Sequence, residues 1–358
     1  MEILITGGNG LLGRHLVDSL LERGEQVRVL ALADEDTSWL DARGVTVHRG
    51  DVRLPRTLTT ATGGVDAVMH LAGMMGVWRP LPDYHAVNVE GTENVCRAAI
   101  AAGARVVHVS SWTVYGMGLA GPVREDSPIR PFREPYATTK AAGDLAVQRM
   151  VRQDGLAAVI VRPGTFFGPH DRLHFARMAD RIRAGRAIIV GRGDNALPFV
   201  YVEDVVRGLL LALDNQSALG QAYNISNDYP LTQQQFVHAI ARGIGARPPR
   251  IHISYRALYA AGYAAERVSA LMRSERQPIV TRLGVKVFGS DNRHSIEKAR
   301  RELGFEPEVS LLDGVRLAAN WYREHCMGEQ SPAAGLAVVK ARASATSQPK
   351  ISTPRSTL

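Results

Sequence analysis

Cysteines are scarce in this sequence, and so are long apolar runs. Two cysteines, Cys96 and Cys326, occur in 358 residues, too few for a disulfide framework, and the helical pattern around Cys96 predicts a buried thiol. No apolar run is long enough to cross a bilayer, and the first expected strand begins at residue 2. We therefore expect neither stable membrane insertion nor a signal peptide, and the absences favour a cytoplasmic protein.

Aromatic residues and lysines are also few. Aromatics make up 6% of the chain, and five residues are lysine, at positions 140, 286, 298, 340 and 350, although the net charge is +8. Arginines scattered along the chain carry the remaining positive charge, so we expect no nucleic-acid partner. Lys140 is the only lysine in the first 285 residues, and it lies four residues after Tyr136.

Short β-branched runs alternate with helical stretches through the first half of the chain. This pattern is typical of βαβ units and predicts an α/β fold, a Rossmann doubly wound parallel sheet. A hydrophobic content of 45% and a charged content of 22% fit a globular protein with a sizeable core. The expected strands span residues 2–6, 26–32, 45–49, 67–71, 105–109 and 158–162, and the expected helices span 11–23, 82–102 and 136–154.

The pattern changes after Pro163-Gly164, which predicts a second unit. We expect a first domain over residues 1–164, to which residues 198–226 return through a strand at 222–225. A smaller C-terminal α/β domain follows over 165–197 and 227–327, and residues 328–358 form a disordered tail. Further helices are expected at 172–184, 205–213, 232–243, 255–272, 297–304 and 312–325, and short strands at 188–190 and 199–202.

A glycine-rich segment follows the first strand and reads Thr6-Gly7-Gly8-Asn9-Gly10-Leu11-Leu12-Gly13. Glycines at this spacing, between a strand and a helix, are typical of a dinucleotide-binding loop. The first glycine allows the tight turn, Gly10 lets the backbone approach a pyrophosphate, and Gly13 lets the helix pack close to the sheet. The unpaired N–H groups at the start of the helix attract the anion.

The end of the second strand distinguishes NAD from NADP in such folds. An acidic residue there binds the ribose hydroxyl, whereas an arginine binds the 2′-phosphate. This chain has Ala31-Leu32 at that point, acidic residues at 34–36, and Arg14 within reach from the glycine loop. Both forms of the cofactor therefore stay open.

Tyr136 and Lys140 are one helical turn apart, so they share a helix face. A nearby ammonium stabilises the phenolate, which lowers a tyrosine pKa from its ordinary value of about 10 and makes the phenol an acid–base group. Ser111 follows the strand at 105–109, at the edge where parallel sheets bind ligands, and its hydroxyl can hold a substrate oxygen. A Tyr-x-x-x-Lys pair alone is more often a solvated helix face. Together with the serine and the glycine loop it favours hydride transfer from a nicotinamide.

At this point the chain resembles an extended short-chain dehydrogenase/reductase, of the NAD-dependent epimerase/dehydratase superfamily, over residues 1–325. The motifs that carry the resemblance are residues 6–13, Gly50-Asp51-Val52, His70-Leu71-Ala72, residues 88–92, residues 110–116, residues 136–140, Arg162-Pro163-Gly164, residues 199–204 and residues 298–304. The resemblance implies that the first domain binds NAD(P) and the second binds the substrate. It also implies a homodimer formed through the helices at 82–102 and 136–154.

The resemblance implies roles for individual residues. Ser111, Tyr136 and Lys140 match the catalytic serine, tyrosine and lysine of the family. The positions that match cofactor contacts are Gly7, Gly8, Asn9, Gly10, Leu11, Leu12, Gly13, Asp51, Val52, Leu71, Ala72, Gly73, Asn88, Ser110, Tyr136, Lys140 and Pro163.

Within the superfamily the chain looks most like the branch of 3β-hydroxysteroid dehydrogenases and dihydroflavonol reductases. Residues 111–113 read Ser-Trp-Thr where dehydratases carry Thr-Asp-Glu, and residues 195–198 lack the arginine with which nucleotide-sugar enzymes bind a diphosphate. The resemblance implies a small, mostly apolar substrate, such as a sterol, polyketide or flavonoid. We expect it to contact Met74, Trp78, Trp112 and Thr113.

Two alternative functions stay open, a nucleotide-sugar 4-epimerase and a non-catalytic dinucleotide-sensing regulator. The helix at 255–272 is expected to act as a lid, with a membrane-surface contact as the second interpretation. His170 and His174 are spaced to share a helix face, but two ligands do not make a metal site, and we expect none.

Overall fold

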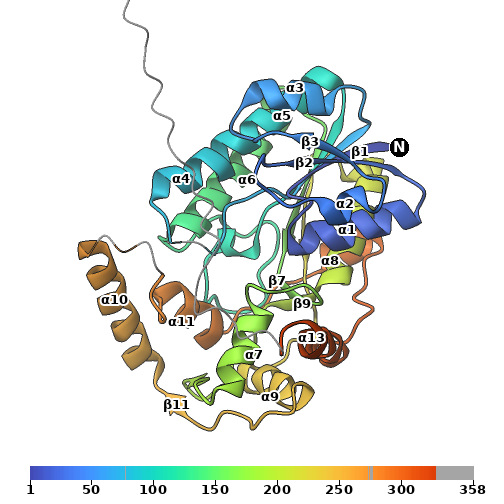
Figure 1. Cartoon of the computed structure of the whole chain (residues 1–358). Coiled ribbons are helices and arrows are strands. Elements are labelled where there is room, and N and C mark those ends of the chain that lie inside the picture. The colour runs from blue at the N-terminus through green and yellow to red at the C-terminus, as the bar shows by residue number, and fades with distance from the viewer. Residues whose placement is uncertain (77, 273, 275–276, 328–358) are drawn as a thin grey trace, which may run out of the picture.

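The computed structural model describes residues 1–327 except 77, 273, 275 and 276 (Figure 1). The tail predicted at 328–358 lies outside the described residues. Seven parallel strands form the centre in the order β10-β6-β5-β4-β1-β2-β3, which confirms the Rossmann doubly wound sheet. The strands are β1 (Glu2–Thr6), β2 (Gln26–Ala31), β3 (Thr46–Arg49), β4 (Ala67–His70), β5 (Arg105–Val109), β6 (Ala158–Pro163) and β10 (Ala222–Ile225).

Side chains along β1 alternate between two hydrophobic cores, one on each face of the sheet. Ile3 and Ile5 lie in the core covered by helices α1 (Leu11–Glu22) and α8 (Val202–Asp214). Leu4 lies in the opposite core, covered by helices α3 (Pro55–Thr62), α5 (Thr92–Ala102) and α6 (Pro135–Gln153). Cys96 of α5 is a free, buried thiol, as predicted.

The helix predicted at 82–102 is wrong as a single element. It consists of α4 (Leu81–His85), a π-helix η1 (Ala86–Gly91) and α5. A π-helix adds one residue per turn without changing the apolar pattern enough to be predicted. The sequence analysis also missed two 3₁₀ helices and five other elements: α3, α2 (Ser38–Asp41), β7 (Thr165–Phe167), β11 (His252–Ile253) and α11 (Arg282–Gly289).

Much of the C-terminal half of the chain lies below the central sheet in the view of Figure 1. Helices α7 (Phe175–Arg183), α9 (Gln233–Gly243) and α13 (Leu311–His325) contact one another, and α10 (Tyr255–Leu271) packs on α11. Two small parallel sheets pair β7 with β9 (Phe199–Tyr201) and β8 (Ile189–Val190) with β11. The remaining elements are the 3₁₀ helices η2 (Trp112–Tyr115) and η3 (Gln216–Ala218) and helix α12 (Glu297–Leu303).

Strand β10 pairs with β6 at the edge of the central sheet, so the chain returns there at residues 222–225 as predicted. This return brings residues of β10 next to the strand that ends in Pro163. The division into two domains, with its boundaries at 164, 198 and 226, stays a prediction.

Candidate active site at the carboxyl ends of the strands

The loops that follow β1, β4, β5 and β6 leave the sheet at one edge, because all four strands are parallel. The glycine loop after β1 lies against the loop after β4. Leu71 N donates to the carbonyl oxygen of Thr6 at 3.0 Å, and Ala72 N donates to the Thr6 hydroxyl at 3.3 Å. The structure thus brings together the two segments that are expected to line the cofactor.

Two glycines of the loop, Gly7 and Gly13, leave no room for a side chain. Gly7 has φ +75°, and a Cβ there would lie 2.7 Å from Ala72 N. A Cβ at Gly13 would lie 2.4 Å from the Gly7 carbonyl oxygen, which is backbone and cannot move aside. At Gly10 the nearest protein atom to such a Cβ is at 3.4 Å. The packing of the protein therefore requires glycine at 7 and 13. At position 10, the absence of a side chain leaves room for a ligand to approach the backbone.

Helix α1 begins at this loop without a side chain to cap it, since its N-cap residue is Gly10. Its first N–H groups are available to an anion, and the helix dipole favours negative charge there. Leu12 is buried in the core, so it can contribute only backbone to a cofactor. An uncapped helix start behind a glycine turn fits the pyrophosphate of a nicotinamide dinucleotide.

Polar side chains near the end of β2 bind other parts of the protein. Asn9 accepts hydrogen bonds from Trp39 Nε1 at 2.6 Å and Arg14 at 3.4 Å, and donates to the Asp36 carbonyl oxygen. The Arg14 guanidinium lies 4.4 Å above the Trp39 ring. Burial raises the pKa of Glu35, whose carboxylate accepts a hydrogen bond from Leu32 N. Glu35 therefore stabilises its own turn.

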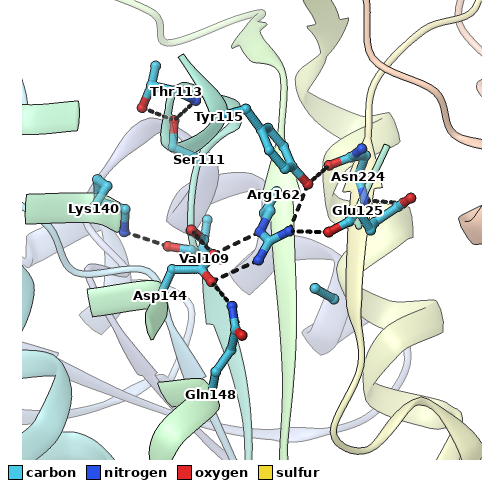
Figure 2. A network of polar contacts seen from close by, with 12 residues as sticks. Val109, Ser111, Thr113, Tyr115, Glu125, Lys140, Asp144, Gln148, Arg162 and Asn224 are labelled. Atoms are coloured by element: carbon cyan, nitrogen blue, oxygen red, sulfur yellow. Dashed lines mark hydrogen bonds and ion pairs between the residues drawn. The ribbon is translucent and has the colours of Figure 1, made fainter. Parts of the chain in front are cut away.

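The Ser111 hydroxyl lies near the Tyr136 phenol, close enough to influence its pKa. Ser111 Oγ accepts from Thr113 N at 3.2 Å and from Thr113 Oγ1 at 2.9 Å (Figure 2). Thr113 therefore orients the serine, a role that the sequence analysis did not assign. Burial raises the pKa of Tyr136, the Ser111 hydroxyl opposes the increase, and the nearby Glu134 adds to it.

Lys140 is buried, and its Nζ donates to the Val109 carbonyl oxygen at 2.7 Å (Figure 2). Burial lowers the pKa of Lys140 to about 8, with a smaller opposite effect from Asp144. The lowered pKa that the sequence analysis expected for Tyr136 is wrong for this structure, because burial raises the pKa of the phenol and Lys140 is not among the groups that shift it.

Asn88 joins three segments of the site from its place in the π-helix. Its side-chain oxygen accepts from Met74 N at 2.7 Å, and its amide donates to the Met74 carbonyl oxygen and to Thr139 Oγ1. A Cβ added at Gly73 would lie 3.3 Å from Asn88 Oδ1 and 3.9 Å from Lys140 Nζ. Asn88 thus fixes the loop after β4 beside helix α6, which carries Tyr136 and Lys140.

Other predicted cofactor positions are engaged with the protein. The Ser110 hydroxyl donates to Asp144 at 2.6 Å and is buried, so its side chain faces the interior. Asp51 binds the Arg53 guanidinium, and Val52 is buried in the core beside α5. Pro163 ends β6 at the same sheet edge as the rest of the site.

The predicted substrate contacts differ in accessibility. Met74 and Trp78 are half-buried on the loop after β4. Trp112 is 3% exposed, donates from Nε1 to Thr165 Oγ1 at 3.0 Å, and meets the His294 ring edge-on. Trp112 therefore packs in the interior of this structure.

Two residues missed by the sequence analysis, Asp144 and Arg162, form a buried ion pair directly behind the site. Asp144 follows Lys140 by four residues on the same helix face, and Arg162 is a charge in an otherwise apolar strand. The spacing of Asp144 from Lys140 and the charge of Arg162 within an apolar strand could have identified the pair, because a buried charge requires a partner.

His170 and His174 do not share a helix face. His170 has φ +71° in a loop, and α7 begins only at Phe175. Across residues 1–327, apart from 77, 273, 275 and 276, no group of three or more His, Cys, Asp or Glu side chains could hold a metal ion. Within the same residues, no helix combines the length and the apolar character needed to cross a membrane.

Comparison with known proteins gives a family and several relatives. The family model described as NAD dependent epimerase/dehydratase family matches residues 3–226. The 2-alkyl-3-oxoalkanoate reductase of Stenotrophomonas maltophilia (strain K279a) is 36% identical over 334 residues, 88% of this chain and 98% of the reductase. The 3-beta-hydroxysteroid dehydrogenase of Mycolicibacterium neoaurum is 31% identical over 340 residues, 90% of this chain and 92% of the dehydrogenase.

Among solved structures, the UDP-glucose 4-epimerase of Thermus thermophilus in complex with NAD is similar at a TM-score of 0.72 and 26% identity. The similarity covers 91% of this chain and 100% of the epimerase. The fold described above is therefore one that holds NAD in a related protein.

Proposed function

This chain belongs to the NAD-dependent epimerase/dehydratase family, and we propose that it interconverts a secondary alcohol and a ketone on a mostly apolar small molecule with NAD(P)(H). Its resemblance to an extended short-chain dehydrogenase/reductase is thereby confirmed, and the chain is an enzyme of that type. The observation that carries the finer proposal is the proximity of the Ser111 hydroxyl to the phenol of Tyr136, which lies one helical turn before the buried Lys140.

The proposed chemistry places the ketone oxygen between Ser111 and Tyr136. Since burial raises the pKa of Tyr136, the phenol keeps its proton at neutral pH and donates it to the oxygen during reduction. Thr113 donates both of its hydrogen bonds to Ser111 Oγ, so the serine's own proton is free to bind the same oxygen. When bound, the cofactor supplies the hydride to the carbonyl carbon.

Lys140 serves the cofactor side of the site in this proposal. Its ammonium uses one donor on the Val109 carbonyl oxygen and has two more. Gly73, in the loop expected to line the cofactor, lies beside Lys140 Nζ. A free ammonium donor there can bind the hydroxyls of a nicotinamide ribose, which orients the ring toward Ser111 and Tyr136.

Two observations support an apolar substrate. Relatives at 36% and 31% identity are named for a 2-alkyl-3-oxoalkanoate and a 3-beta-hydroxysteroid. The segment at 195–198, where nucleotide-sugar enzymes are expected to carry an arginine, has instead Asn195, whose amide donates to the carbonyl oxygens of Phe288 and Ser290, and the buried Leu197. A diphosphate would find no charged partner there.

A nucleotide-sugar 4-epimerase is the second candidate, favoured by the similarity to the Thermus thermophilus enzyme. It would use the same serine, tyrosine and lysine but keep its cofactor through the cycle. The two candidates therefore differ in whether the nicotinamide exchanges with solution.

The proposal is tested by measuring NADH and NADPH oxidation with a panel of β-keto acids and steroid ketones. Tyr136→Phe should lower kcat by about 10²–10⁴-fold, because it removes the proton donor, while the dissociation constant of the cofactor stays near that of the wild type. The matched control is Tyr229→Phe, which removes a hydroxyl from a tyrosine that is 86% exposed.

Unchanged turnover in Tyr136→Phe would remove the tyrosine from the mechanism. Nicotinamide that copurifies with the protein, together with thermal stabilisation by UDP-glucose and inactivity toward every ketone, would favour the epimerase. Homodimerisation through residues 82–102 and 136–154, and a lid function for the helix at 255–272, stay predictions from the sequence analysis.

A further inference from the structure

A buried ion pair lies directly behind Ser111 and Lys140, and the proposed chemistry does not use it. Arg162 Nε binds Asp144 Oδ2 at 2.9 Å and Arg162 Nη2 binds Asp144 Oδ1 at 2.9 Å, so the contact is bidentate. The two side chains are 2% and 0% exposed. Apolar residues of similar volume often stabilise a core as well as a buried ion pair does, so stability alone does not explain this one.

The Asp144 carboxylate connects helix α6 with the end of strand β5. Besides Arg162, it accepts from the Ser110 hydroxyl at 2.6 Å and from Gln148 Nε2 at 2.7 Å (Figure 2). One turn earlier on α6, Lys140 donates to the carbonyl oxygen of Val109. Two consecutive turns of the helix therefore bind the last residue of β5 and the residue that follows it, immediately before Ser111.

Arg162 binds the chain again on the other side of Ser111. Its Nη1 donates to the Tyr115 hydroxyl at 2.7 Å, and that hydroxyl donates to Asn224 Oδ1 at 2.8 Å (Figure 2). Tyr115 is the last residue of η2, the 3₁₀ turn that begins after Ser111 and contains Thr113. Ser111 thus lies between two anchors, Ser110 and Tyr115, and both are held by the same ion pair.

We propose that Arg162 and Asp144 are positioning residues of the active site, which hold Ser111 at the distance from Tyr136 that proton transfer requires. The inference rests on the proposed function, since it assigns the pair to the same site. The pair acts through hydrogen bonds of fixed direction, because a bidentate guanidinium–carboxylate contact specifies orientation as well as distance. An apolar pair would fill the space but leave the segment at 110–115 free to shift.

The first test replaces the pair by apolar residues in the double variant Asp144→Leu/Arg162→Met, which leaves no unpaired charge. We expect a folded protein whose kcat is lower by about 10²-fold, the size expected when reacting groups are misplaced by roughly 1 Å. The KM for the cofactor should change less than about twofold, because the glycine loop is not part of the network. A folded double variant with the kcat of the wild type would overturn the proposal.

Smaller changes test the anchors even if the double variant fails to fold. Ser110→Ala removes the hydroxyl that binds Asp144, and Tyr115→Phe removes the one that binds Arg162. Each should lower kcat by about tenfold, in line with the loss of one charge-assisted hydrogen bond. The matched control is Tyr322→Phe, which removes a tyrosine hydroxyl bound to Asp180 at 2.6 Å, far along the chain from the site.

Amide hydrogen exchange of residues 109–116 provides a readout that needs no substrate. Ser110→Ala and Tyr115→Phe should accelerate exchange in this segment, and Tyr322→Phe should not. If the wild type reduces no ketone, the exchange measurement still tests whether the ion pair holds residues 109–116. Failure of the positioning inference and failure of the proposed function can therefore be told apart. Exchange at 109–116 that matches the wild type in both anchor variants contradicts the inference, as does an equal loss of kcat in the control.

Discussion

Three deeply buried histidines should make the protein lose stability as the pH falls below 6.5. His70, His108 and His294 are 0%, 1% and 6% exposed. Burial lowers the pKa of His70 to about 3 and that of His294 to about 4. Burial, followed by the charge of Lys140, lowers the pKa of His108 well below its ordinary value. All three rings are therefore neutral in the folded protein near neutral pH.

The sign of the effect follows from proton linkage. Between pH 6.5 and the lowered pKa values, the unfolded chain binds protons at these rings and the folded protein does not, so acid favours unfolding. The stabilisation is complete above the unfolded pKa of about 6.5 and is lost progressively as the pH falls. Between pH 7.0 and 5.5, each histidine should lower the free energy of unfolding by roughly 1.3 kcal/mol, and the three together by about 4 kcal/mol.

A change of this size is a large share of the 5–15 kcal/mol that stabilise a typical domain. Urea unfolding followed by tryptophan fluorescence at pH 7.0 and 5.5 measures it directly. The comparison ends at pH 5.5 because Glu125 and Glu134, whose pKa values burial raises, act in the opposite direction when they take up protons in acid.

Single substitutions show which histidine causes the change in the free energy of unfolding with pH. Neither nitrogen of His108 has a hydrogen-bond partner among the described residues, so His108→Leu should remove about a third of the pH dependence and stabilise the protein at pH 5.5. The exposed His85 provides the control His85→Gln, which should keep the full slope. A free energy of unfolding that differs by less than about 1 kcal/mol between the two pH values would refute the reasoning.

Two further predictions concern the site. Gly13→Ala should destabilise or unfold the protein, because its Cβ would lie 2.4 Å from the Gly7 carbonyl oxygen. At Gly10 the nearest protein atom to a Cβ is 3.4 Å away, an ordinary contact, so Gly10→Ala should keep the fold but weaken cofactor binding. Thermal melting and cofactor titration separate the two effects. The kcat for ketone reduction should fall as the pH rises above about 8, where Lys140 loses its proton. The variant Lys140→Met should retain a low rate that does not fall over this range. A pH–rate profile of the wild type that is flat from 7 to 9.5 would contradict the role given to Lys140.

The sequence predicted those parts of the site that depend on local order along the chain. A strand, a glycine turn and a helix in succession determine the loop at 6–13, and the strand before Ser111 together with the helix that carries Tyr136 determines the catalytic edge. Parallel topology then brings these segments together without further information, because the carboxyl ends of parallel strands share one edge.

What the sequence did not predict depends on contacts across the fold. The π-helix at 86–91 places Asn88 toward Met74 and Thr139, and an apolar pattern does not distinguish it from an α-helix. Arg162 appeared only as part of a motif, because its partner Asp144 lies 18 residues earlier on another element. The expected pKa of Tyr136 was wrong for a similar reason, since helical spacing indicates where Lys140 lies but not how deeply the phenol is buried.

Position 140 suits a lysine better than an arginine, although lysine is scarce in this chain. The chain uses arginine for almost all of its positive charge. At position 140, however, Lys140 Nζ is buried and donates to one protein acceptor, the carbonyl oxygen of Val109. A guanidinium there would bring five N–H donors to the same place. An arginine also stays charged at any pH, whereas burial brings the pKa of Lys140 to about 8. An ammonium is compact enough to fit between Val109 and Gly73 and keeps two donors, which the proposed function assigns to a ribose. The one lysine of the first 285 residues therefore stands where its size and its titration both matter.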